Sequence, residues 1–198
     1  MLFAFSSCNE KADNENTSSG DMPATVTGSI TFKEYGTMKF ELYLDKVPNS
    51  CLNFIYLAQQ GYYEGVVVHR LVKDFVIQAG AFTTGYAQKA GVDYSIKGDF
   101  SDNGVTNPVN HKKGTLAWAR ANANDSASTQ FYICTSDATA AQLDGRYAAF
   151  GMITEGFDII DEINGIATDM YDRPVHEVMI EKVVIDSDYN FPEPEKIK

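Results

Sequence analysis

The segment that most constrains the fold is 66–80, VVVHRLVKDFVIQAG, which places one arginine and one glutamine inside two apolar runs. β-Branched and aromatic residues dominate 66–72 and 75–77, and this composition is typical of β-strands. The polar pair Lys73-Asp74 interrupts the apolar pattern between the two runs. The segment therefore predicts two short strands joined by a polar break.

Alternation along these strands predicts where the two polar side chains lie. Side chains alternate across a strand, so we expect Val68 and Arg70 on one face and Val76 and Gln78 on another. A guanidinium and a carboxamide next to Phe75 and Val76 would form an apolar surface with two polar groups, which suits recognition. In the alternative interpretation, both are the solvent-facing side of an ordinary antiparallel sheet, where arginine is common. The segment alone leaves both interpretations open.

Composition excludes several classes of protein. The chain has 198 residues, of which 44% are hydrophobic, and this is enough for one core of ordinary size. Its formal net charge of −11 disfavours nonspecific binding to nucleic acid or anionic lipid. No apolar run reaches 18 residues, so the sequence predicts no membrane span. No Cys-x-x-Cys or Cys/His spacing occurs either, so we expect no metal and no cofactor.

The N-terminal residues 1–8, MLFAFSSC, form a short apolar run that ends at Cys8. The run is similar to the last part of a bacterial lipoprotein signal, in which the cysteine is lipidated, although Phe5 departs from the usual aliphatic residue. Residues 9–24 are polar and lack aromatics, which predicts a disordered tether. We therefore expect 1–24 to be a signal remnant and tether, with Cys8 as lipidation site and only membrane attachment, in a bacterial cell envelope (periplasm or outer membrane). The alternative is a disordered start with an incidental cysteine.

The remaining pattern is that of a strand-rich domain over 25–188, followed by a loosely attached tail at 189–198. About eight short strands and two helices suggest a mainly β fold, a closed eight-stranded antiparallel β-barrel capped by two α-helices. The first helix starts at Pro48, which suits a first helical turn, and stops before Gly61. The other expected elements are a hairpin over 25–33 and 37–44, a long loop over 81–110, strands over 116–121, 130–135, 148–152 and 178–185, a helical turn over 137–142 and a helix over 156–164.

The same alternation separates core from surface in the later strands. It predicts a core containing Trp118, Phe131 and Ile133. The opposite face would then gather, beside Arg70 and Gln78, the side chains of Ala119, Ala121, Gln130 and Tyr132. Among the other titratable residues, we expect His69 to face the core, His111 and His176 to be exposed, and Cys51 and Cys134 to be buried free thiols, with a disulfide between the two as the less favoured alternative.

Several motifs, in order along the chain, carry a family resemblance. They are Val68-His69-Arg70 with Phe75, Gln78 and Ala79-Gly80, then 114–121 (GTLAWARA), 129–132 (TQFY), 143–145 (LDG) and 150–151 (FG). Over 29–185 they resemble the cyclophilin family of peptidyl-prolyl cis-trans isomerases, which matches the barrel expected above. Animal members carry Trp and His where Gln142 and Tyr147 stand here, so we expect weak binding of cyclosporin-type ligands.

The resemblance implies an isomerase that accelerates X-Pro bond rotation during folding of exported proteins, as a monomer acting on proline-containing peptides and unfolded proteins. Rotation crosses a barrier of roughly 18–20 kcal/mol but breaks no bond, so it needs no nucleophile, metal or covalent intermediate. We expect Arg70 to donate to the proline nitrogen of the twisted state and Gln78 to orient the guanidinium. The expected substrate-binding residues are Phe75, Val76, Ala119, Arg120, Ala121, Gln130, Tyr132, Leu143 and Tyr147. The alternative is a proline-segment binding module or chaperone that uses the same groove with little turnover.

Overall fold

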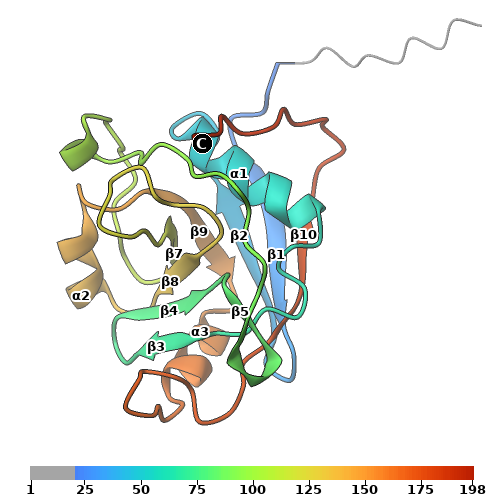
Figure 1. The fold of residues 1–198 in the computed structure, drawn as a ribbon, viewed down its shortest axis with the longest axis vertical. Coiled ribbons are helices and arrows are strands. Elements are labelled where there is room, and N and C mark those ends of the chain that lie inside the picture. The colour runs from blue at the N-terminus through green and yellow to red at the C-terminus, as the bar shows by residue number, and fades with distance from the viewer. Residues whose placement is uncertain (1–20) are drawn as a thin grey trace, which may run out of the picture.

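The computed structural model describes residues 21–198 (Figure 1). The lipidation site predicted at Cys8 and all but the end of the tether predicted over 1–24 lie outside the described residues. In the described part of the chain, no helix combines the length and the apolar character that a bilayer crossing requires.

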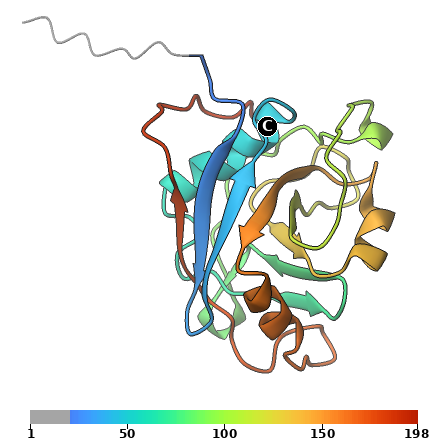
Figure 2. The same ribbon diagram turned by 180° about the vertical axis from the view of Figure 1, so that it is seen from behind.

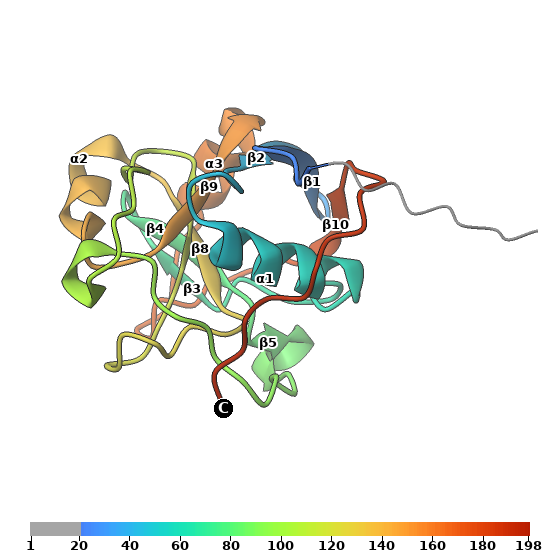
Figure 3. The same ribbon diagram turned by 90° about the horizontal axis from the view of Figure 1, so that it is seen from above.

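One antiparallel sheet of eight strands curls around the core (Figure 3). Its order is β10-β1-β2-β9-β7-β8-β4-β3. The strands are β1 (Val26–Phe32), β2 (Gly36–Leu42), β3 (Arg70–Val72), β4 (Val76–Ala79), β7 (Thr115–Trp118), β8 (Phe131–Cys134), β9 (Ala149–Glu155) and β10 (Ile180–Ile185). Two more strands, β5 (Phe82–Thr83) and β6 (Ala87–Gln88), form a separate hairpin within the predicted loop 81–110.

The two ends of the sheet meet without forming a ladder between β3 and β10. The amide of Val68 donates to the carbonyl of Val178 at 2.8 Å, and the amide of Ile180 donates to the carbonyl of Val66 at 2.8 Å. These bonds join the chain before β3 to the start of β10. The predicted mainly β, eight-stranded antiparallel fold is confirmed, as a strongly curled sheet that stays open between its two edge strands, β3 and β10.

Helices cover the two ends of the curled sheet (Figures 1 and 2). Helix α1 (Pro48–Gln59) has its proline at the first helical position, as predicted, and buries Cys51, Phe54 and Ile55. Helix α3 (Phe157–Asn164) lies near the other end. The predicted turn at 137–142 is the four-residue helix α2 (Asp137–Ala140), followed by a 3-10 turn over Ala141–Leu143.

The core has two parts, and the smaller one forms the floor of the site described below. In the larger part, the Phe54 ring packs against Phe131 at 5.3 Å and Trp118 at 6.3 Å between ring centroids. Trp118, Phe131 and Ile133 are all buried there, as predicted. The smaller cluster lies on the other face of β4, β7, β8 and β9 and contains Val76, Ala117, Tyr132, Cys134, Ala140, Leu143 and Ala149. Cys51 and Cys134 are buried free thiols on opposite faces of this sheet.

Two expectations about individual segments are wrong. Val68 is fully buried in the larger core, whereas Arg70 is partly exposed, because the chain has no regular strand structure at 68–69 and alternation does not carry across that gap. The C-terminal tail is also held in place. The Asn49 side chain bonds to the backbone amide of Glu195 at 2.6 Å and to its carbonyl at 3.1 Å, while Ser95 pairs with Ile197.

Candidate active site

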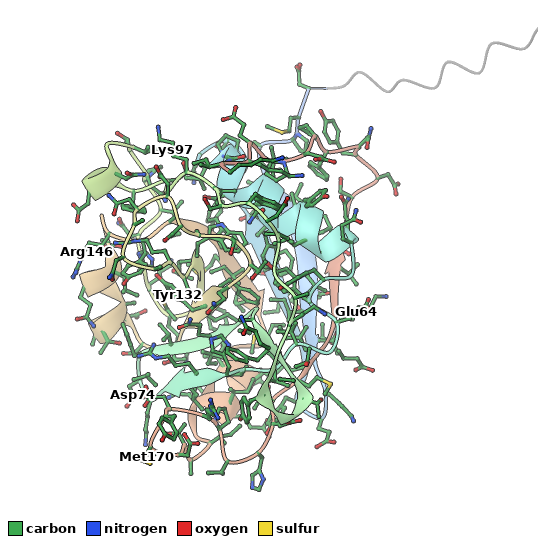
Figure 4. All side chains as sticks on the ribbon, viewed as in Figure 1. Glu64, Asp74, Lys97, Tyr132, Arg146 and Met170 are labelled. Carbon is green, nitrogen blue, oxygen red and sulfur yellow. The ribbon has the colours of Figure 1, made fainter. Side chains whose placement is uncertain are left out.

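Most of the predicted site residues line one shallow hollow on the outer face of the sheet. This central hollow has a volume of about 110 Å³, and Figure 4 shows its Tyr132 in the middle of the face and Arg146 toward its margin beside α2. Its lining consists of Arg70, Phe75, Val76, Gln78, Ala119, Arg120, Tyr132, Leu143 and Tyr147. The other two, Ala121 and Gln130, line an adjoining hollow of about 230 Å³ that shares Gln78, Ala119 and Arg120 with the first.

Strand register brings the polar and aromatic groups together. Strand β4 lies between β3 and β8, and Gln78 stands directly opposite Arg70 on one side and Tyr132 on the other. Directly opposed residues in an antiparallel pair have Cβ atoms about 4.5–5.5 Å apart. Arg70, Gln78 and Tyr132 therefore form a row across three strands, with the guanidinium at the edge of an apolar depression.

The carboxamide of Gln78 makes its hydrogen bond with Gln130. Its Nε2 donates to the Gln130 Oε1 at 3.0 Å. The charged partner of Arg70 is instead Asp172, whose Oδ2 lies 3.5 Å from the arginine Nε. Sequence reasoning missed Asp172, because an aspartate in a loop far along the chain carries no local signal for this contact.

The hydroxyl group of Tyr132 points away from the hollow toward His111. The His111 Nε2 lies 3.1 Å from that hydroxyl oxygen, and its Nδ1 lies 2.8 Å from the Oδ1 of Asp144. His111 is only 4% exposed, so the expectation that it is exposed is wrong. Asp144 explains the burial, because one carboxylate oxygen accepts from both the backbone amide and the ring of His111.

The proton positions in this chain of contacts follow from burial. Burial lowers the pKa of His111, and its bond with Asp144 opposes this only in part. The neutral ring then donates through Nδ1 to Asp144 and accepts at Nε2 from the Tyr132 hydroxyl. Burial likewise raises the pKa of the Tyr132 phenol. Tyr132 therefore presents only its aromatic ring to the central hollow.

The Arg120 guanidinium joins two loops at the border between the hollows. It lies over the rings of Phe100 and Tyr147, at 5.1 and 4.9 Å from their centroids. Its nitrogens donate to the carbonyl of Arg146 at 3.1 and 3.2 Å, and to that of Ala121 at 3.0 Å. Its charge is thus engaged with backbone oxygens, while small side chains on either side of it, at 119 and 121, leave room for a peptide backbone.

His69 lines a neighbouring hollow of about 190 Å³ that it shares with Arg70, and it is only half-buried, so the expectation that it faces the core is wrong. Its ring packs against Phe82 at 4.9 Å between centroids, and burial lowers its pKa to about 4. Within residues 21–198 its buried Nδ1 has no hydrogen-bond partner.

The site as a whole combines one permanently charged donor, from Arg70, with an apolar floor formed by Val76, Tyr132 and Leu143. Such a surface can bind a compact apolar ring and stabilise a developing lone pair beside it.

Comparisons with known proteins agree with this geometry. Residues 27–185 match the family model described as cyclophilin type peptidyl-prolyl cis-trans isomerase/CLD. A peptidyl-prolyl cis-trans isomerase from Acinetobacter baylyi is 37% identical over 139 residues, covering 69% of this chain and 71% of that protein. Peptidyl-prolyl cis-trans isomerase B from Escherichia coli is 33% identical over 167 residues, covering 79% of this chain and 98% of that protein.

Solved structures give the same result. A cyclophilin type isomerase from Cryptosporidium parvum has a TM-score of 0.70 and 27% identity, with 83% of this chain and 99% of that one covered. A crystal structure of that protein in the presence of the dipeptide Ala-Pro has a TM-score of 0.69 and 28% identity, with 82% and 99% covered. The chain therefore belongs to the cyclophilin family of peptidyl-prolyl cis-trans isomerases.

Proposed function

We propose that this isomerase binds the proline ring of its substrate in the central hollow and that Arg70 donates a hydrogen bond to the proline nitrogen as the X-Pro bond twists. The observation that carries the proposal is the row of Arg70, Gln78 and Tyr132 across β3, β4 and β8, which sets a guanidinium beside an apolar floor. The ring would contact Phe75 and Tyr132.

The hydrogen bond from Arg70 to the proline nitrogen would form only in the transition state. In the planar imide the proline nitrogen shares its lone pair with the carbonyl group and is a poor acceptor. In the twisted imide the nitrogen becomes pyramidal and basic, so a donor there stabilises the transition state more than either planar isomer. A hydrogen bond to a charged group contributes about 1.5–3 kcal/mol, which corresponds to about 10- to 100-fold in rate.

The residues that precede proline would occupy the adjoining hollow. Ala119 and Ala121 leave space for the backbone, and the bonded carboxamides of Gln78 and Gln130 offer polar edges to it. If this side of the peptide is held while the other side turns, the binding energy lowers the barrier to rotation about the X-Pro bond. The Cryptosporidium parvum structure determined in the presence of the dipeptide Ala-Pro supports a proline-containing ligand.

The test is a protease-coupled proline-turnover assay on a panel of X-Pro peptides. We expect Arg70→Ala to lower kcat/KM about 10- to 100-fold, and Arg70→Lys to recover only part of it, because an ammonium lacks the planar set of donors. Arg146→Ala is the matched control, since it removes an exposed guanidinium near the margin of the hollow. An unchanged rate for Arg70→Ala would remove Arg70 from the mechanism. Peptide binding without turnover by the unaltered protein would favour a binding module instead.

The cellular setting is the second part of the proposal: the protein assists the folding of exported proteins in the bacterial envelope, anchored by a lipid at Cys8. Support comes from the lipoprotein-like residues 1–8 and the polar residues up to 24, which precede the first strand at Val26. Metabolic labelling with palmitate tests this in the unaltered protein and in Cys8→Ser. Label that disappears in the variant would support the anchor, and absence of label from both would overturn it.

A further inference from the structure

We infer that Asp172 is a positioning residue that holds the Arg70 guanidinium in the orientation needed for isomerisation. The inference rests on the role proposed above for Arg70. It begins from the ion pair between the Arg70 Nε and the Asp172 Oδ2, which are 3.5 Å apart. Asp172 does not line the central hollow, so it would act on the substrate only through Arg70.

Asp172 sits in a turn that is fixed by its own hydrogen bonds. The Oδ1 of Asp169 accepts from the backbone amides of Tyr171 at 2.8 Å and Arg173 at 2.9 Å, and the amide of Asp169 donates to the carbonyl of Arg173 at 2.8 Å. These bonds hold the Asp169 pKa below its usual range. The turn therefore keeps its shape without help from Arg70. Met170, labelled in Figure 4, marks its exposed side.

The turn is also attached to the strand that carries Arg70. β3 is the last strand of the sheet, and the amide of Leu71 donates to the carbonyl of Asp172 at 2.8 Å. Asp172 has a φ of 60°, in the left-handed region that aspartate adopts more readily than most residues. Its backbone thus bonds to the residue next to Arg70, while its side chain reaches the guanidinium itself.

The geometry of this contact leaves the useful donors of Arg70 free. The carboxylate approaches Nε, the inner nitrogen of the head group, and Arg70 lines the central hollow, so its two terminal nitrogens can act as donors there. An arginine side chain loses considerable rotamer entropy when it is fixed, and a charged partner beside Nε restrains it before the substrate arrives. Preorganisation of this kind lowers the barrier without a new contact to the substrate.

The same carboxylate also offsets the positive charge of Arg70, which would weaken the hydrogen bond to proline. The two effects predict opposite outcomes when the charge is removed. The side chains are 39% and 49% exposed, so water screens the charge effect strongly, whereas the turn and its backbone bond to Leu71 keep the carboxylate beside the guanidinium. Orientation is therefore the larger effect, and loss of the carboxylate slows the enzyme.

The first experiment measures kcat and KM separately for Asp172→Asn and Asp172→Gly on one X-Pro peptide. Both replacements tolerate the left-handed backbone, so the turn can keep its conformation. We expect kcat to fall about 3- to 5-fold in Asp172→Gly, with a smaller loss in Asp172→Asn and little change in KM, because an exposed pair contributes up to about 1 kcal/mol. The matched control is Glu34→Gln, which removes an acidic charge at another left-handed position (φ 71°) in the β1–β2 turn.

The second experiment separates positioning from a general structural effect. Asp172→Gly is introduced into the Arg70→Ala background, where it should have no further effect if it acts only through Arg70. An unchanged or raised kcat in both Asp172 variants would overturn the inference, and so would the same fold-loss repeated in the Arg70→Ala background. An unchanged rate for Arg70→Ala alone would instead overturn the proposed function, so the two failures are distinguishable.

Discussion

The Nε2 of His111 lies 3.1 Å from the hydroxyl oxygen of Tyr132, and this contact makes an apolar surface out of a tyrosine. The hydroxyl donates into a buried ring that Asp144 holds on its other side at 2.8 Å. What remains facing the central hollow is the aromatic ring. We therefore expect the hydrogen bond between His111 and Tyr132 to contribute more to the stability of the fold than to catalysis.

Tyr132→Phe should separate these two effects. It leaves the His111 Nε2 buried and without its donor, which costs about 1–3 kcal/mol of unfolding free energy. The ring itself stays in place, so we expect kcat/KM to fall by less than about twofold. Urea denaturation measures the free energy of unfolding, and the proline-turnover assay measures kcat/KM. Tyr35→Phe, in the turn between β1 and β2, serves as control. A large loss of turnover with unchanged stability would contradict this account.

Stability should fall as the pH is lowered through the histidine range. Burial lowers the folded-state pKa of His111 and takes that of His69 to about 4, whereas an unfolded histidine has a pKa of about 6.5. Between these values the unfolded chain binds protons that the folded chain does not, so the free energy of unfolding decreases from about pH 6.5 toward pH 4. Each histidine contributes less than about 1.4 kcal/mol per pH unit, and His69 less again because it is partly open to solvent.

Urea denaturation at several values between pH 7 and pH 4.5 tests this dependence. Replacing His69 with Gln should flatten the curve, and the difference between the two proteins isolates the contribution of that ring from those of the carboxylates. Equal slopes for the variant and the unaltered protein would show that His69 takes up its proton equally in both states.

Much of the site could be predicted from the sequence because it depends on local alternation. Along β7 and β8, a period of two places Trp118 and Phe131 in the core and leaves Ala119 and Tyr132 on the other face, and no distant information is needed. The same rule failed at Val68, because the chain leaves regular strand geometry before Arg70.

The remaining features depend on contacts between distant segments. Asp144 makes His111 a buried residue, and nothing in the spacing of the two indicates the pair. The contact between Asp172 and Arg70 depends on how the turn after α3 folds back against β3. Single aspartates in loops are common, so no sequence pattern favours Asp172 over the others.

Arg120→Lys should affect binding more than turnover. The guanidinium holds the backbone carbonyls of Ala121 and Arg146 and lies over two aromatic rings, and a lysine can reproduce neither the paired donors nor the planar stacking. Without these bonds the two loops become more mobile, and the adjoining hollow no longer keeps a fixed shape. We therefore expect KM to rise about 3- to 5-fold, or about 1 kcal/mol, with kcat nearly constant. Arg146→Lys serves as control. A change confined to kcat would place Arg120 in the chemical step instead.

Removing residues 187–198 should destabilise the domain, because the tail is bonded to α1 and to the long loop. Asn49 bonds to both backbone groups of Glu195, and the amides and carbonyls of Ser95 and Ile197 pair at 2.8 and 2.9 Å. After the entropy of ordering the tail, these bonds contribute about 1–3 kcal/mol, equivalent to a Tm lower by about 3–8 °C.

The point variant Asn49→Ala should reproduce about half of this loss, whereas Asn190→Ala, at an exposed position in the same tail, should have no effect. Hydrogen exchange gives an independent measurement, since the amides of Ser95 and Ile197 should be protected in the full chain and the Ser95 amide should exchange rapidly after truncation. Fast exchange at both amides in the full chain, together with an unchanged Tm on truncation, would restore the loosely attached tail that the sequence predicted. Slow exchange would instead show that a few residues beyond β10 complete the packing around α1.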